Sequence, residues 1–339
     1  MHDPDSVDCR LCQRKKILYN HNMKKVIFDT DIGIDDAMAL LFLHYSPNVD
    51  LLGITTGFGN ASIETTTRNA LYMKERFEIE ATVYRGAAQP IGQETIREYP
   101  NFVHGINGLG NIEISEPRGL PHELSGAQAI VELARQHPKD LSIVAVGRMT
   151  NLAQALELCP ELPELVHEVA VMGGAFGFNG HSGNVTPVAE ANIAGDAMAA
   201  DIVFTSGMPI TIVGLDVTQE TVVDLQFFDD LMHDAGDAGK FIHEISRFYL
   251  DFHEQLHGKL ECPVHDASAV AYLLAPHNYV TQEGFVRVVT EGSNKGQTLF
   301  ETPHAGDAGN GKPGCRICTS VDAQSVRELL AATLRLAAD

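Results

Sequence analysis

Short apolar runs alternate with longer helical patterns along most of this 339-residue chain. The run at residues 24–29 is β-branched and predicts a strand, whereas the longer apolar stretch at residues 35–45 predicts a helix. The other runs that predict strands are residues 49–56, 81–87, 141–147, 166–174, 201–207 and 209–217. The other stretches that predict helices are residues 62–76, 125–136, 150–158 (with Thr150 as N-cap), 194–200 and 242–257.

This alternation predicts an α/β fold with an open, mostly parallel, Rossmann-like sheet and helices on both faces. The strands are nearly continuous apolar runs, as expected where both faces of a sheet are covered. No linker divides the chain, so we expect one domain over residues 23–339. Residues 1–22 are polar and aperiodic, and we expect a partly disordered extension there. Three long connections, at residues 88–122, 175–192 and 218–265, are candidates for functional loops.

Four carboxylates lie within eight residues directly after the first predicted strand: Asp29, Asp31, Asp35 and Asp36. A helix N-terminus stabilises each by only ~0.3–1 kcal/mol. Each repelling pair at ~4 Å costs on the order of 4 kcal/mol at an effective dielectric constant of about 20. A bound divalent cation would resolve the conflict, and oxygen ligands favour Ca²⁺ or Mg²⁺ over zinc. The alternative is a solvated, helix-capping acid cluster without a metal.

Further polar side chains follow the other predicted strands. In a doubly wound sheet the carboxyl ends of the strands meet at one crevice, so these side chains would join the acid cluster there. They are hydrogen-bonding groups suited to the hydroxyls of a sugar: Asn60, Asn184, Glu190 and Asn192. Glu190 and Asn192 are equally compatible with structural roles.

Two histidines are candidate proton donors. His265 precedes Asp266 at the start of an apolar helical run, and His104 lies in the first long connection. The pair at 265–266 could supply a metal ligand and an acid, or a helix cap and a surface histidine.

The chain carries DTDIGIDD at residues 29–36, the GN after the second strand, VGRMTN, the MGG…GN…AEAN region and the late HD. With these motifs the sequence resembles the nucleoside hydrolases, especially their inosine-uridine preferring group and its pyrimidine-leaning bacterial relatives. Five separated signatures occur in the same order, and the resemblance runs from Met23 to the C-terminus. It implies the nucleoside hydrolase fold, a bound Ca²⁺ and hydrolysis of the N-glycosidic bond of purine or pyrimidine ribonucleosides. It also implies a homodimer or homotetramer.

The resemblance assigns a role to each candidate residue. Calcium would be bound by the side chains of Asp31, Asp36 and Asp266 and by the backbone carbonyl of Val146, with Asp29 behind them as support. The ribose hydroxyls would be held by Asp35, Asn60, Asn184, Glu190 and Asn192. His265 and His104 would lie near the base. Asp31 would be the general base for an attacking water, and His265 would protonate the leaving base.

Three positions depart from the family pattern. Val146 replaces the usual Thr, which a carbonyl ligand tolerates, and Ile32 replaces a Pro in the predicted metal loop. Arg148 also stands where the family usually has Pro, and the sequence does not indicate where its side chain points.

The chain carries 45 acidic against 24 basic residues, a formal net charge of -21. This excess argues against nucleic acid and anionic membranes as partners, and an acidic crevice would favour nucleosides over nucleotides. No run approaches the ~20 apolar residues of a membrane span. The N-terminus lacks a secretory signal, so we expect a cytoplasmic location with reduced cysteines. Two CxxC pairs, Cys9/Cys12 and Cys315/Cys318, could form a zinc site, but ordinary thiols are the simpler interpretation.

Two other functions fit parts of the sequence. A strand that ends in DxD also opens the haloacid dehalogenase-like, Mg²⁺-dependent phosphatases. A calcium-dependent nucleoside-binding protein without activity would use the same scaffold, although the candidate base Asp31 argues against it. The preferred base is left open, and Phe248, Tyr249, Phe252 and His253 are candidates for stacking on it or for plain core packing.

Overall fold

The computed structural model describes residues 23–92, 98–302 and 314–338. Eleven strands occur in these residues: β1 (Lys24–Thr30), β2 (Val49–Thr56), β3 (Thr82–Arg85), β4 (Leu141–Ala145), β5 (Val166–Met172), β6 (Ile210–Val213), β7 (Val222–Asp224), β8 (Glu261–Pro263), β9 (Tyr279–Val288), β10 (Thr298–Glu301) and β11 (Cys315–Val321). Nine of them form one sheet in the order β10-β9-β11-β6-β5-β4-β1-β2-β3. All neighbours from β11 to β3 run parallel, and β9 pairs antiparallel with both β11 and β10.

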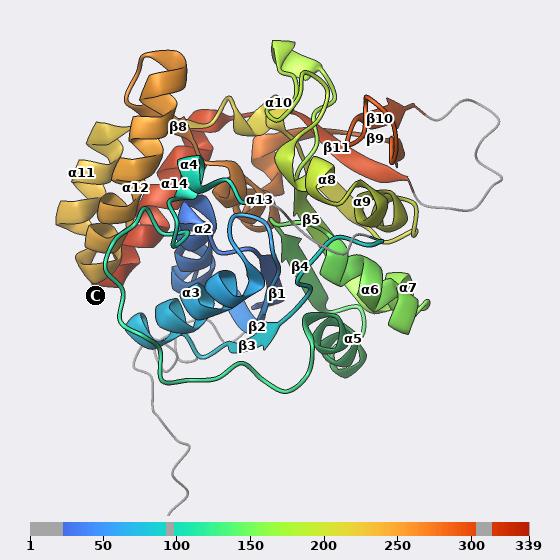
Figure 1. Ribbon diagram of the computed structural model, residues 1–339, viewed down its shortest axis with the longest axis horizontal. Coiled ribbons are helices and arrows are strands. Elements are labelled where there is room, and N and C mark those ends of the chain that lie inside the picture. The colour runs from blue at the N-terminus through green and yellow to red at the C-terminus, as the bar shows by residue number, and fades with distance from the viewer. Residues whose placement is uncertain (1–22, 93–97, 303–313, 339) are drawn as a thin grey trace, which may run out of the picture.

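The α-helices of the described residues are α2 (Ile34–Tyr45), α3 (Ile63–Arg76), α4 (Asn101–His104), α5 (Gly126–Gln136), α6 (Thr150–Leu158), α7 (Leu162–Leu165), α8 (Ala191–Gly195), α9 (Ala197–Phe204), α10 (Leu215–Thr218), α11 (Leu225–Asp234), α12 (Gly236–His257), α13 (His265–Leu274) and α14 (Ala323–Arg335). Figure 1 shows α11, α12 and α14 on one side of the sheet and α5, α6 and α9 on the other. The predicted α/β sheet with helices on both faces is therefore confirmed.

Two apolar layers hold these helices to the sheet. Along β1, Val26 and Phe28 belong to the layer under α2, α12, α13 and α14, while Ile27 belongs to the layer under α5, α6 and α9. All three side chains are fully buried. A strand buried on both faces needs apolar residues at consecutive positions, which explains the continuous runs in the sequence.

Three local predictions are wrong. The run at residues 209–217, expected to be one strand, is a strand only at Ile210–Val213, and Leu215 begins the helix α10. Residues 201–207, expected to be a strand, form the end of α9 and the turn after it. The carboxylate of Asp196 caps this helix at the amide of Ala199, and Val203 is buried while Ile202 stays 40% exposed, so the run packs with one face only. Thr150 is the first residue of α6, and Met149 is the N-cap; the Thr150 hydroxyl donates to Asp196 at 2.7 Å instead of capping the helix.

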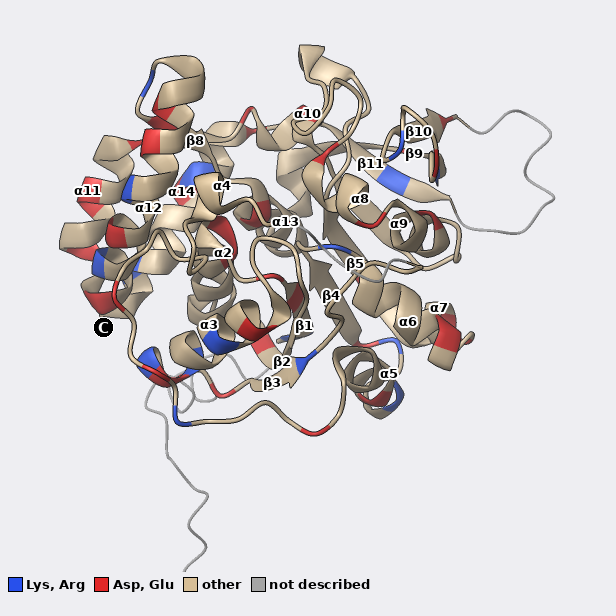
Figure 2. Ribbon diagram, in the orientation of Figure 1, with Lys and Arg blue, Asp and Glu red and all other residues tan. Residues whose placement is uncertain are grey.

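Other expectations fall partly outside the description. Cys9 and Cys12 lie outside the described residues, as does the extension at residues 1–22. No helix in the described part of the chain is long and apolar enough to cross a membrane. The acidic residues are spread over outer helices and loops as well as around the start of α2 (Figure 2).

Candidate active site

The acid cluster lies at the junction between β1 and α2. The strand ends at Thr30 and the helix begins at Ile34, so the cluster sits at the carboxyl edge of the sheet. Asp31, Asp35 and Asp36 are all buried, with at most 6% of each residue exposed. Buried carboxylates are stable only when hydrogen bonds, cations or protonation offset the loss of water.

Asp36 organises the loop that carries the cluster. Its Oδ1 accepts hydrogen bonds from the Thr30 hydroxyl at 2.5 Å and the Asp31 amide at 3.2 Å. Its Oδ2 accepts from the Gly33 amide at 2.9 Å and from Asn60 Nδ2 at 2.8 Å. This carboxylate is therefore fixed in place by the loop and by a side chain from the end of β2.

Asp31 is held at one oxygen only. Its Oδ2 accepts a hydrogen bond from the Asn60 amide at 2.8 Å, whereas its buried Oδ1 has no partner among the described residues. Glycines permit this close approach: a Cβ at Gly59 would lie 1.8 Å from Oδ2, and one at Gly147 would lie 2.7 Å from Oδ1. The ends of β2 and β4 thus enclose Asp31 while leaving one oxygen free for a ligand.

The carboxylates of Asp35, Asp36 and Asp266 each offer an oxygen within 4.8 Å of the others. The Oδ1 of Asp35 is a second buried oxygen without a partner in the described structure. Burial and the neighbouring acids raise the pKa of Asp35 to about 8 and that of Asp266 well above its usual value. The donor set therefore fits a hard divalent cation, which would bind these free oxygens and offset their mutual repulsion.

The predicted calcium ligands differ in part from this group. Asp36 and Asp266 belong to it, and Asp35, predicted as a ribose ligand, joins them. The carbonyl of Val146 accepts a hydrogen bond from Asn192 Nδ2 at 2.7 Å, which places the fourth predicted ligand beside a predicted ribose residue. Asp31 reaches the same region through Asn60, which contacts both Asp31 and Asp36.

Asp29 lies behind the cluster. Its Oδ1 accepts from the Thr55 hydroxyl at 2.5 Å and from Asn151 Nδ2 at 2.8 Å. Burial raises the pKa of Asp29 to about 6, and the two hydrogen bonds limit that rise. Because these partners come from β2 and α6, Asp29 ties the strand ends together below the cluster.

The predicted ribose residues occupy different positions. Glu190 is buried and caps α8, accepting from the amides of Asn192 and Ile193 and from the Gly174 amide. Asn192 therefore starts a short helix whose position is set by Glu190. Asn184 is exposed, and its Oδ1 accepts from the Ala191 amide at 3.0 Å. The structure thus brings Asn60, Glu190 and Asn192 close to the acid cluster or to the Val146 carbonyl, whereas Asn184 is exposed and bonds to the Ala191 amide.

His104 lies against the loop that carries the acid cluster. His104 Nδ1 accepts a hydrogen bond from the Ile34 amide at 3.2 Å and lies 3.9 Å from Asp35 Oδ1. Burial lowers the pKa of His104 to about 4, so at pH 7 the ring is neutral and carries its proton on Nε2. Asn69 fixes the His104 loop to the metal loop, because its Nδ2 donates to the carbonyls of Ile32 and Asn107.

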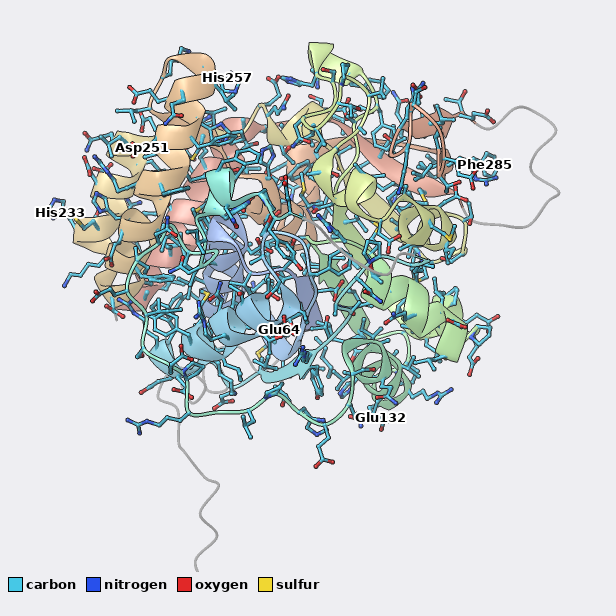
Figure 3. The ribbon with its side chains drawn as sticks, viewed as in Figure 1. Glu64, Glu132, His233, Asp251, His257 and Phe285 are labelled. Atoms are coloured by element: carbon cyan, nitrogen blue, oxygen red, sulfur yellow. The ribbon has the colours of Figure 1, made fainter. Side chains whose placement is uncertain are left out.

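Helix α12 contributes the rings beside His104. The Tyr249 ring stacks on His104 at a centroid distance of 5.9 Å, and His253 lies edge-on to Tyr249 at 4.6 Å. Neither ring nitrogen of His253 has a partner among the described residues, although only 6% of the residue is exposed. His257 continues this row at the end of α12 (Figure 3).

His265 begins α13, next to Asp266. Its Nδ1 lies 2.8 Å from the hydroxyl of Thr218, and burial lowers its pKa to about 3. Sequence reasoning missed Thr218, because it stands at the end of the short helix α10 with no distinctive motif around it. It also left Arg148 unplaced, and this side chain lies over the ring of Phe58 at 4.6 Å.

The zinc alternative gains no support from the described cysteines. Cys315 and Cys318 are buried in β11, and Cys315 Sγ lies 3.3 Å from the Phe204 carbonyl. Within the described residues, neither belongs to a group of potential metal ligands.

Comparison with known proteins agrees with this geometry. Residues 26–328 match the family described as inosine-uridine preferring nucleoside hydrolase. The chain is 37% identical over 312 residues to probable uridine nucleosidase 2 of Arabidopsis thaliana, covering 91% of this chain and 96% of that protein. It is 36% identical over 299 residues to the pyrimidine-specific ribonucleoside hydrolase RihB of Escherichia coli (strain SE11), covering 87% and 93%.

Solved structures give the same result. A purine-preferring ribonucleoside hydrolase from Gardnerella vaginalis superposes with a TM-score of 0.87 at 32% identity, covering 93% of this chain and 99% of that one. The plant nucleoside hydrolase PpNRh1 superposes with a TM-score of 0.86 at 35% identity, covering 92% and 99%. These matches do not favour the phosphatase or the inactive binding protein. The chain is an N-ribohydrolase that acts on ribonucleosides, and it belongs to the inosine-uridine preferring nucleoside hydrolase family.

Proposed function

We propose that this hydrolase requires calcium and that Asp31 is its general base. The observation that carries the proposal is the free, buried Oδ1 of Asp31 beside the group formed by Asp35, Asp36 and Asp266. A bound calcium ion would keep these carboxylates ionised and lower the pKa of a coordinated water. It would be held by Asp31, Asp36, Asp266 and the Val146 carbonyl, with Asp35 close enough to contribute.

The chain's own residues then carry the reaction. Asp31 Oδ1 accepts the proton of a water that attacks C1′ of the ribose. The buried carboxylates around it stabilise the positive charge that develops on the sugar in an oxocarbenium-like transition state. Asn60, Glu190 and Asn192 hold the hydroxyls and thereby fix the sugar relative to the water, and the exposed Asn184 would join them.

His265 acts on the leaving base. Its ring is neutral at pH 7 because burial lowers its pKa to about 3. We propose that the neutral ring donates a hydrogen bond to the base, and that it protonates the base only after it takes up a second proton from solvent, which leaves the ring neutral again. His265→Ala should slow inosine and uridine far more than p-nitrophenyl riboside, whose leaving group needs no proton. Equal losses on all three substrates would contradict this role.

Uridine is the substrate we expect first. The Nε2 proton of His104 is a donor suited to the carbonyl oxygens of uracil, and His253 offers two further free ring nitrogens. Curated relatives named as uridine nucleosidases support this choice.

One experiment tests the central proposal. Purified protein is incubated with purine and pyrimidine ribonucleosides, with a chelator, and with calcium or magnesium restored, while free ribose is measured. We expect ribose from uridine, its loss on chelation and its recovery with calcium. Activity that survives thorough chelation, or returns only with magnesium, would refute the calcium requirement. A homodimer or homotetramer and a cytoplasmic location stay predictions, which size-exclusion chromatography and cell fractionation would test.

A further inference from the structure

Arg148 brings a positive charge to the edge of the acid cluster. It follows β4 by three residues and precedes α6 by two. Its guanidinium carbon lies 4.6 Å from the centroid of the buried Phe58 ring. On another side its chain passes over Gly195 at the end of α8, where an added Cβ would lie 2.1 Å from Arg148 Nε. The guanidinium is thus held between the β2–α3 loop and α8.

The guanidinium lies near several acidic groups of the candidate site. It interacts electrostatically with Asp31, Asp196 and Glu190, and with the phenol of Tyr99. Among the described residues, none accepts a hydrogen bond from it. The guanidinium is held in place by the Phe58 ring and Gly195 and is not paired with a single carboxylate. Its charge therefore acts on all the acids of the cluster together.

This placement bears on the balance between the metal-free and the metal-bound protein. Without a metal, the buried carboxylates repel one another, and a nearby guanidinium offsets part of that repulsion. With a divalent cation in place, the same guanidinium repels it. A group that stabilises the metal-free protein more than the metal-bound protein weakens metal binding by the difference between the two free energies.

We propose that Arg148 is a positioning residue that serves as an internal counter-cation. It steadies the acid cluster while the metal is absent, and it holds the affinity for the metal below the value that the carboxylates alone would give. The inference rests on the proposed calcium site but not on nucleoside hydrolysis. Because solvent screens part of the repulsion between charges of +1 and +2, we expect the Arg148 charge to change Kd by about three- to tenfold.

The test compares three variants of the full-length protein. Arg148→Met keeps a flexible side chain on Phe58 but removes the charge, and Arg148→Lys keeps the charge. Arg135→Met removes the same charge from a surface pair with Glu161 and serves as the matched control. Calcium binding to stripped protein is measured by calorimetry, and Tm is measured with and without calcium.

Arg148→Met should bind calcium about three- to tenfold more tightly than the wild type. Its stripped form should melt at a lower temperature than stripped wild type, and calcium should restore much of the difference. Arg148→Lys and Arg135→Met should stay within about twofold of the wild-type Kd. Weaker or unchanged calcium binding by Arg148→Met would overturn the proposal and leave Arg148 as a packing element.

The test of Arg148 can fail or succeed independently of the proposed enzymatic function. Absence of ribose release with intact calcium binding would refute the enzymatic proposal only. If the wild type binds no calcium, the stripped proteins still decide, because the counter-cation predicts a lower Tm for Arg148→Met than for Arg148→Lys. Equal melting temperatures in that case would overturn the role of the charge.

Discussion

His253 is a buried histidine without hydrogen-bond partners among the described residues, and replacing it should make the protein more stable and less active. It lies on α12 between Tyr249 and His257, with 6% of the residue exposed. A buried polar group without a partner costs about 1–3 kcal/mol. His253→Phe keeps a planar ring of similar size against Tyr249 and removes both nitrogens. We therefore expect the free energy of unfolding at pH 7 to rise by about 1–3 kcal/mol.

The stability advantage of His253→Phe over the wild type should grow as the pH falls. Burial lowers the pKa of His253 from 6.5 to about 4, so between these values the unfolded chain binds a proton that the folded protein does not. The stability associated with the neutral ring is complete above pH 6.5 and is lost as the pH falls towards 4. By linkage, the advantage of His253→Phe should be about 2 kcal/mol larger at pH 5 than at pH 7.

The assay is urea unfolding of both proteins at pH 7 and pH 5, each with calcium in excess, together with ribose release from uridine. If the ring nitrogens serve the base, kcat/KM should fall about 10- to 100-fold, the loss expected for one hydrogen bond to the reacting substrate. His243→Phe, on the same helix but paired with Asp229, is the matched control and should not stabilise the protein. Lower stability of His253→Phe at pH 7, or an advantage that does not change with pH, would refute this reasoning.

Three other predictions concern the acid cluster and the scaffold. Asp31→Asn should lower kcat on the order of 10²–10⁴-fold while circular dichroism stays unchanged, because it removes the base without changing the volume; near-normal kcat would exclude Asp31 as the base. Removing calcium with a chelator should lower Tm, and excess calcium should restore it, since a ligand that binds the folded state stabilises it; an unchanged Tm would argue against a cation at the cluster. Lys74→Met should lower the free energy of unfolding by about 1–2 kcal/mol in urea titrations, because Lys74 Nζ donates to the carbonyls of Ile79, Glu80 and Ala81; no loss would mean that water replaces these bonds.

Local pattern was sufficient for much of the fold. The strands β1 to β6 were predicted from short apolar runs, because a strand covered on both faces must be apolar at consecutive positions. Residues 201–207 show the limit of this reasoning. A short apolar helix and a buried strand can have the same composition, and here the run continues a helix that Asp196 caps at the Ala199 amide.

The candidate site shows the same division. The acid cluster at residues 29–36 follows β1 directly in the sequence, so its place at the end of this strand could be predicted. The parallel topology then places Asn60, Glu190 and Asp266 at the same edge of the sheet. Which oxygens are free could not be predicted from the sequence. Asp31 and Asp36 are the same residue type, yet both oxygens of Asp36 accept hydrogen bonds while Asp31 Oδ1 accepts none from the described residues.

The sequence by itself determined the fold class, the family and the edge of the sheet where the chemistry lies, since these follow from apolar periodicity and from the order of short motifs. Only the tertiary structure decided where the Arg148 side chain lies, which nitrogen of His104 is the donor, and that the ring nitrogens of His253 have no hydrogen-bond partner among the described residues. Each of these depends on atoms contributed by segments far apart in the chain, and spacing within one segment carries no information about such contacts.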